Sequence, residues 1–257
     1  MPTRSGYAEG IPSWVDLGTP DVEGAKAFYS AIFGWAYREE DAGSSQYFTA
    51  LCGGLPAAGI GPLQDETTPS TWTTYFAVDD ADATAARIRE AGGAIVLEPS
   101  AVGQAGRLAI ATDPTGAVFG VWQAGEHFGA GIVNEHGGLN WNELVTEDIE
   151  GATVFYGRVF GHEGETEDWG EGQTYTTFKV GGRGIAGGAA KPGPDISNQW
   201  NVYFAVDDAS AAINAATAAG GSVLREARET DGVGIIARLA DPYGASFAII
   251  QLSLEID

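Results

Sequence analysis

The sequence repeats itself once, at an offset of 127 to 128 residues, and this duplication limits the possible folds more than any other feature. One alignment pairs PSWVDLGTPDVEGAKAFYSAIFGW with GLNWNELVTEDIEGATVFYGRVFGH, so that Trp14 matches Trp141 and Asp16 matches Glu143. A second alignment pairs TWTTYFAVDDADATAARIREAGG with QWNVYFAVDDASAAINAATAAGG, and each segment runs on to an Asp-Pro-x-Gly turn. The chain is therefore predicted to hold two copies of one domain.

The length of the chain agrees with this duplication. Its 257 residues suit two domains of about 100 to 150 residues each. We place these domains at residues 8–125 and 135–254, with the boundary near the glycine-rich segment GEHFGAGIVNEHGG. Hydrophobic residues make up 44% of the chain and charged residues 19%, which is the balance of an ordinary globular protein, so each half is expected to bury its own core.

Charge and cysteine content narrow the partners and the compartment. The chain has 13 Lys and Arg residues against 35 Asp and Glu residues, and the net charge of -22 repels phosphate backbones and anionic lipids. We therefore expect no nucleic-acid partner and no membrane partner. Cys52 is the only cysteine, so an internal disulfide cannot form. No apolar run reaches the roughly 20 residues that span a bilayer, and the first residues lack the apolar core of a secretion signal, so a cytoplasmic location is expected.

Helix signals recur at matched points of the repeat. Asp21 is a predicted N-cap for a helix over 22–33, where apolar residues recur at three- and four-residue spacing, and the segment 149–160 repeats this pattern. In the second part of each half, the strand motif YFAVDD leads into a helix that ends at a Gly-Gly pair. With three strands after each helix, the chain is predicted to form four βαβββ units, two in each domain.

The order of these elements, with YFAVDD before a helix, AGG at its end and DPxG before the last strand, resembles the vicinal oxygen chelate superfamily. That superfamily includes glyoxalases, extradiol dioxygenases and bleomycin-resistance proteins. More narrowly, the WVDL and WNEL strands in tandem look like the actinobacterial 27-kDa-antigen or glyoxalase-like hydroxylase group. The resemblance implies an α+β fold of two tandem glyoxalase-like domains with internal pseudo-twofold symmetry. Because such a pair is similar to the dimer of single-domain members, we expect a monomer or a weak homodimer.

Metal-dependent members of the superfamily place their ligands on the first and last strands of each unit, and this chain lacks such ligands at the matched positions. Counting from the recurring turn motifs, we find eight matched positions: Trp14, Gly59, Thr73, Gly120, Trp141, Gly187, Asn201 and Ala248. None of them is a His or a carboxylate, and Thr and Asn bind transition metals poorly. His127 and His136 fall in the predicted linker and His162 follows a helix end, so all three are expected to be loop or solvent-exposed residues. We therefore expect no metal and no other cofactor.

Residues two apart on a strand share a face, so the neighbours of these positions identify candidate site residues. Asp16 and Glu143 are the candidate catalytic residues, because each stands two residues after a tryptophan on the first strand of its half. The candidate ligand-binding residues are Trp14, Tyr47, Thr73, Tyr75, Trp122, Trp141, Tyr175, Asn201 and Tyr203. Phe48 and Phe178 are further wall candidates, and Trp169 is a rim candidate. Two simpler interpretations stay open: the aromatic residues can pack in the core, and the acids can accept hydrogen bonds from backbone or from an arginine.

Three functions fit this pattern. The first is a metal-free glyoxalase-fold protein that binds a small aromatic or amphipathic molecule, such as a flat ligand bearing a cation or a hydroxyl, in an aromatic-lined cleft, for sequestration or in an accessory role in small-molecule metabolism. The second is an enzyme, either a metal-independent lyase or isomerase with Asp16 or Glu143 as general base or a component of a hydroxylation pathway. The third is a regulatory or surface-interaction protein. The sequence has no G-x-S-x-G, H-E-x-x-H or P-loop motif that would favour another chemistry.

Overall fold

The computed structural model describes residues 4–42, 45–63, 65, 67–170 and 172–253. The elements of the first half are β1 (Pro12–Thr19), α1 (Val22–Phe33), β2 (Ala36–Ala42), β3 (Ser45–Cys52), β4 (Leu55–Pro62), β5 (Thr71–Ala77), α2 (Ala81–Glu90), β6 (Ala94–Val102), β7 (Gly106–Thr112) and β8 (Val118–Ala124). Those of the second half are β9 (Leu139–Thr146), α3 (Ile149–Phe160), β10 (Glu163–Asp168), β11 (Thr174–Val180), β12 (Arg183–Ala190), β13 (Gln199–Ala205), α4 (Ala209–Ala218), β14 (Ser222–Thr230), β15 (Gly234–Ala240) and β16 (Ser246–Leu252). The four predicted βαβββ units are present.

Each half forms one eight-stranded sheet from its two units. The strand orders are β2-β3-β4-β1-β5-β8-β7-β6 and β10-β11-β12-β9-β13-β16-β15-β14, so the two halves have the same topology. Within each unit the first strand pairs in parallel with the last, as β1 does with β4, and the first strands of the two units pair antiparallel at the centre of the sheet. The predicted α+β architecture with an internal pseudo-twofold relation is confirmed.

Local sequence explains where the helices begin and end. The Asp21 carboxylate accepts the backbone N–H of Gly24 at the start of α1, and Asp148 does the same for Gly151 at the start of α3. Such an N-cap satisfies a donor that has no partner within the helix. Gly34 ends α1 in the left-handed region, with a φ of 68°. The helices predicted over 22–33 and 149–160 are therefore found over those residues.

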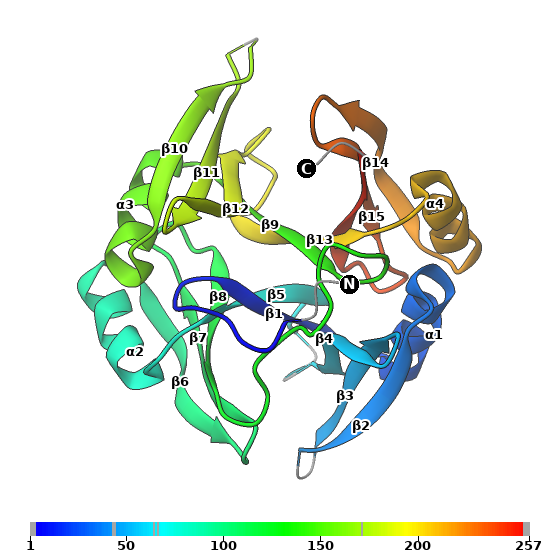
Figure 1. The fold of residues 1–257 in the computed structure, drawn as a ribbon, viewed down its shortest axis with the longest axis horizontal. Helices are drawn as coiled ribbons and strands as arrows, with labels where there is room; N and C mark the ends of the chain where they lie inside the picture. The colour runs from blue at the N-terminus through cyan, green and yellow to red at the C-terminus, as the bar shows by residue number, and fades with distance from the viewer. Residues whose placement is uncertain (1–3, 43–44, 64, 66, 171, 254–257) are drawn as a thin grey trace.

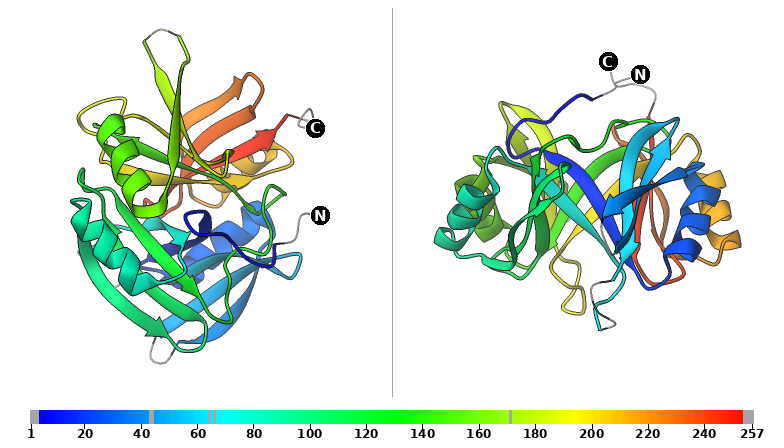
Figure 2. Two further views of the ribbon diagram at one scale, coloured as in Figure 1. Left: turned by 60° about the vertical axis from the view of Figure 1, so that its left-hand side comes forward. Right: turned by 90° about the horizontal axis from the view of Figure 1, so that it is seen from below.

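The two sheets lie back to back, with the central strands β1, β5, β9 and β13 across the middle of the molecule (Figure 1). Helices α1 and α4 pack together on one side and α2 and α3 on the other, so each helix pair joins the two halves (Figures 1 and 2). The outer strands of each sheet bend away from the other half (Figure 1). We call the face of each sheet opposite its helices the inner face. No helix in the described ranges is long and apolar enough to cross a membrane.

The hydrophobic core is shared between the halves, so the expectation that each half buries its own core is wrong. One buried cluster joins Tyr29 and Phe33 of the first half to Phe204 and Phe247 of the second. A second cluster joins residues of β5, β7 and β8 to residues of α3, β11 and β13. The physical reason is that one helix per unit covers only part of the helix-bearing face of a sheet, and the remainder is buried against the other half.

A buried hydrogen-bond relay crosses from one half to the other. The hydroxyl of Tyr29 on α1 accepts the indole N–H of Trp72 at 3.0 Å and donates to Oδ2 of Asp241 at 3.2 Å. Asp241 belongs to the turn before β16, so a helix of the first half is bonded to a turn of the second. Burial raises the pKa of the Tyr29 hydroxyl well above its usual range, which keeps this group neutral and able to donate.

The second relay is the counterpart of the first. The indole N–H of Trp200 donates to the hydroxyl of Tyr156 at 2.8 Å, and that hydroxyl donates to Oδ2 of Asp113 at 3.2 Å. The other carboxylate oxygen of Asp113 accepts the backbone N–H groups of Thr115 and Ala117. The Asp-Pro-x-Gly motif of each half therefore forms a turn and also bonds to the other half.

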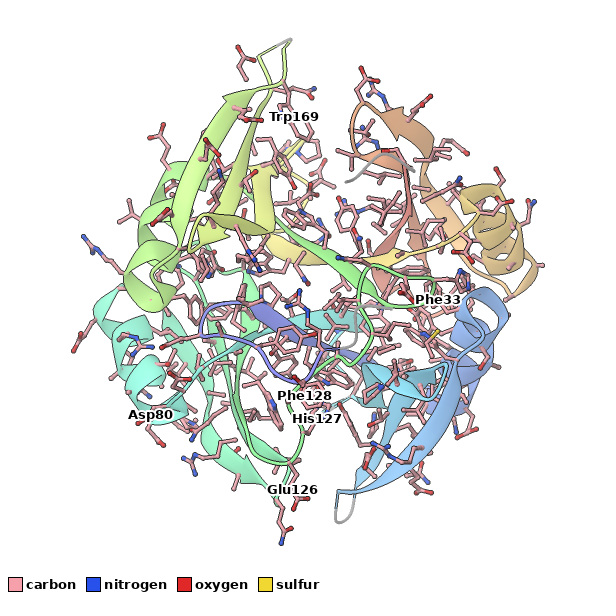
Figure 3. All side chains as sticks on the ribbon, viewed as in Figure 1. Phe33, Asp80, Glu126, His127, Phe128 and Trp169 are labelled. Atoms are coloured by element: carbon pink, nitrogen blue, oxygen red, sulfur yellow. The ribbon has the colours of Figure 1, made fainter. Side chains whose placement is uncertain are left out.

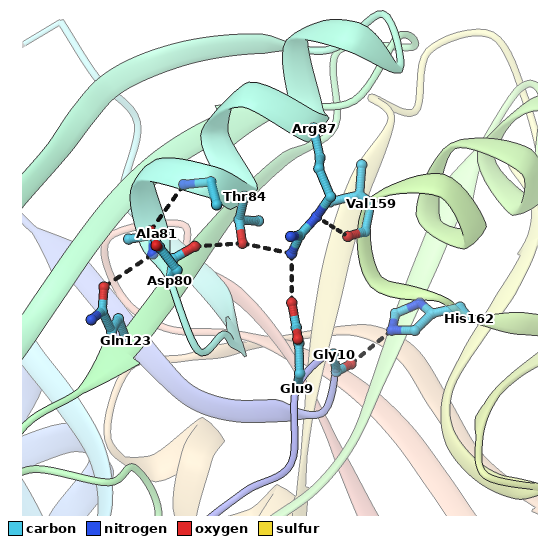
Figure 4. Close-up of polar contacts among 10 residues, drawn as sticks. Glu9, Gly10, Asp80, Ala81, Thr84, Arg87, Gln123, Val159 and His162 are labelled. Atoms are coloured by element: carbon cyan, nitrogen blue, oxygen red, sulfur yellow. Dashed lines mark hydrogen bonds and ion pairs between the residues drawn. The ribbon is translucent and has the colours of Figure 1, made fainter.

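The segment before β1 also ties the halves together (Figure 4). A side-chain N–H of Arg87 on α2 donates to Glu9 at 2.5 Å, and another donates to the backbone carbonyl of Val159 at the end of α3 at 2.9 Å. Nε2 of His162 lies 2.7 Å from the carbonyl oxygen of Gly10 (Figure 4). These contacts join both halves to the first residues of the chain.

His162 lies in the loop after α3, as expected, but it is buried, which corrects the expectation of solvent exposure. Only 6% of its surface is exposed, and its ring lies against those of Tyr156 and Phe160. Burial lowers the pKa of His162 to about 4, so the ring is neutral at pH 7. The chain turns inward directly after the glycine that ends α3, and this turn carries the next side chain into the core. His136, by contrast, is partly exposed, as expected.

Replacing Tyr156 by Phe is expected to destabilise the whole molecule by about 1 to 3 kcal/mol, because the buried groups of Trp200 and Asp113 lose their shared partner. Equilibrium denaturant unfolding measures this change. The matched control is Tyr243→Phe, which removes a more exposed hydrogen bond to Asp21 and should change stability by less than about 0.5 kcal/mol. An unfolding midpoint of Tyr156→Phe equal to that of the wild type would contradict the role given to the relay.

Candidate functional site

The strand register brings the predicted residues of the first half together. In the antiparallel pair of β1 and β5, Trp14 lies opposite Tyr75 and Asp16 lies opposite Thr73. Side chains at alternate positions of a strand share a face, so these four lie on the side away from the helices. Trp122 joins them from β8, which pairs with β5. We call this the first inner face.

Asp16 is the centre of a hydrogen-bonded cluster on the first inner face. Its Oδ1 atom accepts the indole N–H of Trp14 at 2.7 Å and the hydroxyl of Tyr47 at 2.6 Å. Burial raises the pKa of Asp16 above its usual range, although the hydrogen bonds from Tyr47, Trp14 and Tyr75 lower it. Asp16 is partly exposed as a residue, and neighbouring side chains already donate to its carboxylate.

Glycine at two of the matched metal-ligand positions makes room for tyrosine. Gly59 lies beside Asp16 in the parallel pair of β1 and β4, and a Cβ atom at Gly59 would lie 2.0 Å from the Tyr47 hydroxyl. A Cβ atom at Gly120 would lie 2.2 Å from the ring of Tyr75. Real Cβ atoms do not approach other atoms so closely, so a side chain at either position would displace these groups. The space that a metal ligand would use is occupied by tyrosine side chains.

His127 lies in the connecting segment, as expected, and it also covers part of the first inner face. The connecting segment after β8 carries His127 and Phe128 across the first half (Figure 3). The imidazole packs edge-on against Trp14, with ring centroids 4.4 Å apart, and the indole N–H of Trp122 donates to the backbone carbonyl of His127 at 2.8 Å. Burial lowers the pKa of His127 to about 4, so the covering ring is neutral at pH 7.

The second half has the same plan with different contacts. In the antiparallel pair of β9 and β13, Trp141 lies opposite Tyr203 and Glu143 lies opposite Asn201. The Tyr203 hydroxyl donates to Oε2 of Glu143 at 2.8 Å, and the indole N–H of Trp141 donates to the Tyr175 hydroxyl at 2.9 Å. We call this the second inner face. Trp141, Glu143 and Tyr175 are all partly exposed, so solvent reaches it.

Glu143 lies in surroundings that favour its neutral form. Burial raises the pKa of Glu143 above its usual range. The hydrogen bond from Tyr203, the charges of Arg238 and Arg225, and the amide of Asn201 act in the opposite direction and only partly offset the effect of burial. A carboxyl group of this kind can accept a proton more easily than an exposed one.

Arg238 is the functional candidate that the sequence analysis missed. It lies opposite Ala248 in the pair of β15 and β16, so it shares the second inner face with the matched metal-ligand position. The first half has Ile110 at the matched place, opposite Gly120. The sequence signal for Arg238 is the difference between the two copies, which have Arg238 and Ile110 at matched positions. Residues that are alike in both copies identify the other candidates but not this one.

Trp169 lies at the edge of the second inner face, as predicted. It stands between β10 and β11, at the far end of that hairpin (Figure 3), and 52% of its surface is exposed. Its ring stacks on Tyr175 with centroids 4.4 Å apart and an angle of 13° between the planes. The Tyr175 hydroxyl in turn lies over Gly187, where a Cβ atom would be 1.8 Å away.

The prediction that Phe48 and Phe178 line the inner faces is wrong. Phe178 is fully buried in the shared core with Tyr156 and Trp200, and Phe48 is buried with the Lys26 ammonium 3.8 Å from its ring centre. The physical reason is the alternation of a strand. Residues separated by an odd number of positions point to opposite sides, so these phenylalanines cannot share a face with the tyrosines predicted beside them.

The residues at the eight matched positions do not fit a metal site. Within the described ranges, no group of three or more His, Cys, Asp or Glu side chains is placed to hold an ion. Burial raises the pKa values of Tyr47 and Tyr75 well above their usual range, so neither hydroxyl offers an anionic oxygen near neutral pH. We therefore derive no chemical step through a metal.

A hollow of about 320 Å³ lies at one end of the first half. Its lining includes Tyr7 from the segment before β1, Asp79 from the segment after β5, and Phe128 from the connecting segment. It touches the first inner face through Trp122. Some buried side-chain atoms in the described ranges lack a hydrogen-bond partner, but none of them belongs to a residue that lines this hollow. The hollow therefore offers no unpaired buried group for a ligand, and no function is assigned to it.

The sequence matches one protein family in both halves. A model of the glyoxalase/bleomycin resistance protein/dioxygenase superfamily matches residues 11–121 and 138–249. The chain belongs to this superfamily. The resemblance drawn from the repeated motifs is thereby confirmed, and so is the tandem arrangement of two glyoxalase-like domains.

Individual members of the superfamily resemble the chain over nearly its full length. "Putative glyoxylase CFP32" of Mycobacterium tuberculosis is 42% identical over 256 residues, which cover 98% of each chain. "Anthracycline biosynthesis protein DnrV" of Streptomyces peucetius is 36% identical, over 96% of this chain and 94% of its own. The crystal structure of the Mn(II)-bound glyoxalase from Novosphingobium aromaticivorans has a TM-score of 0.65 at 18% identity, over 96% of this chain and 84% of its own. That likeness shows the fold alone.

Replacing Gly59 by Ala is expected to break the Asp16 cluster, because the new methyl group would overlap Asp16 and Tyr47. We expect a loss of about 1 to 3 kcal/mol of stability, measured by denaturant unfolding. Gly193→Ala is the matched control, since no atom lies within 4 Å of a Cβ atom there and stability should not fall. If Gly59→Ala were as stable as Gly193→Ala, the described position of the Tyr47 side chain would be wrong.

Proposed function

We propose that the protein binds a small aromatic or amphipathic molecule on an inner face without the help of a metal, in sequestration or in an accessory role in small-molecule metabolism. The observation that carries this proposal is a set of aromatic residues gathered around one carboxyl group in each half, where the matched metal-ligand positions hold neither His nor a carboxylate. Aromatic walls favour flat rings and cations, and a carboxylate accepts a hydrogen bond from a hydroxyl or an ammonium group.

The names of two relatives support the aromatic character of the ligand. DnrV and DauV, which are 36% and 35% identical to this chain, are both named as anthracycline biosynthesis proteins. Anthracyclines are flat polycyclic compounds that carry hydroxyl, carbonyl and amino groups. A ligand of this general chemistry would meet both the aromatic residues and the carboxyl group of an inner face.

Titration of the protein with 2-naphthol and with proflavine, a planar aromatic cation, is expected to quench tryptophan fluorescence in a saturable way, because Trp141 is partly exposed on an inner face. Addition of EDTA should leave the affinity unchanged. Trp141→Phe should reduce the quenching amplitude. Absence of saturable quenching by both compounds, or loss of binding in EDTA, would refute the proposal.

An enzymatic role is the second candidate, and one observation favours it. Glu143 is partly exposed, and burial raises its pKa, as a general base that works near neutral pH requires. Asp16 is less suited to this role, because Oδ1 of Asp16 already accepts two side-chain donors and His127 covers part of its face. The reaction class would be removal of a proton next to a carbonyl group.

If Glu143 is a general base, the protein should speed the exchange of α-protons of 2-tetralone, a bicyclic ketone, for deuterium from D2O. The rate should rise with pH through the raised pKa of Glu143, because only the deprotonated form accepts a proton. Glu143→Gln should lower it about 100-fold or more, measured by NMR. Glu147→Gln, at an exposed residue paired with Lys191, is the control that should keep the rate. Equal rates in wild type and Glu143→Gln would exclude the role.

A further inference from the structure

The second inner face holds two buried donor groups without partners. In the described part of the chain, four buried side-chain atoms make no hydrogen bond: His127 Nε2, His162 Nδ1, Asn201 Nδ2 and Arg238 Nη2. A neutral histidine ring nitrogen can be left as a weak acceptor, but the nitrogens of Asn201 and Arg238 always carry hydrogen. Buried N–H groups without an acceptor are rare and unfavourable. Glu143 acts on both groups, but neither nitrogen makes a hydrogen bond of normal length and angle, so both donors are suited to an acceptor from a ligand.

The contacts of Asn201 leave its amide nitrogen as a donor toward the inner face. Its side-chain oxygen accepts the amide N–H of Gln199 at 2.9 Å, which fixes the orientation of the group. Only 2% of the Asn201 surface is exposed. The amide lies close enough to Glu143 to influence its carboxylate, yet its nitrogen makes no hydrogen bond of normal length and angle. The donor is thus fixed in place but unpaired.

Arg238 lies near the same carboxyl group without pairing to it. Arg238 lies opposite Ala248 of β16, and Ala248 lies opposite Tyr203 of β13. The Tyr203 hydroxyl donates to Glu143, so the guanidinium and the carboxyl group share the second inner face. No carboxylate of a described residue lies within ion-pair distance of Arg238. A guanidinium with a buried N–H that has no partner is suited to bind a carbonyl or an ionised oxygen.

The first inner face has no counterpart of these two donors. Ile110 and Thr73 stand at the places that match Arg238 and Asn201. The carboxylate of Asp16 is bonded to its neighbours, and the ring of His127 lies against Trp14 at the face. The two copies have the same backbone plan, so the difference between them lies in the side chains. Only the second copy combines buried donors without partners with a partly exposed glutamate and partly exposed aromatic residues.

We propose that the second inner face is the ligand-binding site of this chain, and that its ligand is a flat aromatic molecule with a carbonyl or ionised oxygen that binds Arg238 and Asn201. A hydroxyl beside that oxygen would donate to Glu143, and the stacked rings of Trp169 and Tyr175 would border the aromatic part. This inference rests on the proposed binding function and narrows it to one face and one ligand chemistry.

Because the chain is strongly acidic, the Arg238 guanidinium can attract an anionic ligand only at short range. The net charge is -22, with 13 Lys and Arg residues in the whole sequence, so the field around the molecule repels an anion at a distance. A guanidinium on the inner face acts only once the ligand has entered. Salt screens the distant repulsion more than it weakens a partly buried contact, so added salt should not reduce the affinity for an ionised ligand.

The test compares 3-hydroxy-2-naphthoate with 2-naphthol, which have the same rings and hydroxyl and differ by the carboxylate. Calorimetry should show that the wild type binds the naphthoate more tightly. Arg238→Ile, which installs the residue of the first copy, should weaken naphthoate binding by at least about tenfold and change 2-naphthol binding by less than about threefold. Arg238→Gln checks that the loss is not a packing defect, and Arg158→Leu on the exposed side of α3 should bind like the wild type.

The indole N–H signals in a nitrogen-proton NMR spectrum identify the face. Naphthoate should shift the signals of Trp141 and Trp169 and leave those of Trp14 and Trp122 in place. Shifts confined to Trp14 and Trp122, or equal naphthoate affinity in wild type and Arg238→Ile, would overturn this inference while the proposed binding function stands. Failure of both compounds to bind the wild type at millimolar concentration would overturn both.

Discussion

Burial of the helix-bearing faces between the two halves is the constraint on which the rest of the structure depends. Tyr29 and Tyr156 stand at equivalent points of this contact, and each bonds a helix of one half to a turn of the other. The aromatic clusters around them contain residues from both halves, so neither sheet has a complete core by itself. Because these faces are used for cohesion, only the inner faces remain free to differ in chemistry.

Much of the fold could be predicted because its signals are local. The helix that follows Asp21 has its N-cap, apolar spacing and terminal glycine within fourteen consecutive residues, and the structure reproduces all three. Strand alternation correctly placed Trp14 beside Asp16 and Trp141 near Glu143, since a two-residue period needs no knowledge of the rest of the fold. Each of these sequence signals occurs twice, once in each copy of the repeat, so the prediction for one copy supports the prediction for the other.

The remaining features depend on contacts between distant parts of the chain. The sequence shows Gly59 and Tyr47 as separate residues, and only the register of β3 and β4 shows that one makes room for the other. His127 lies in a loop, as its neighbours predict, but only the path of the connecting segment shows that its ring packs on Trp14. The residues around Arg238 form no recognisable motif. Arg238 becomes a candidate ligand-binding residue only because the sheet places it near the carboxyl group of Glu143.

The covalent link between the halves has a genetic consequence. In a dimer of identical subunits, one codon change alters both sites at once, so a substitution that improves one pocket is also imposed on its twin. In this chain the two copies are encoded separately, and each can mutate alone. Ile110 and Arg238 are such a divergent pair, at equivalent places on the two sheets. Fusion thus allows one copy to specialise while the other is retained as scaffold.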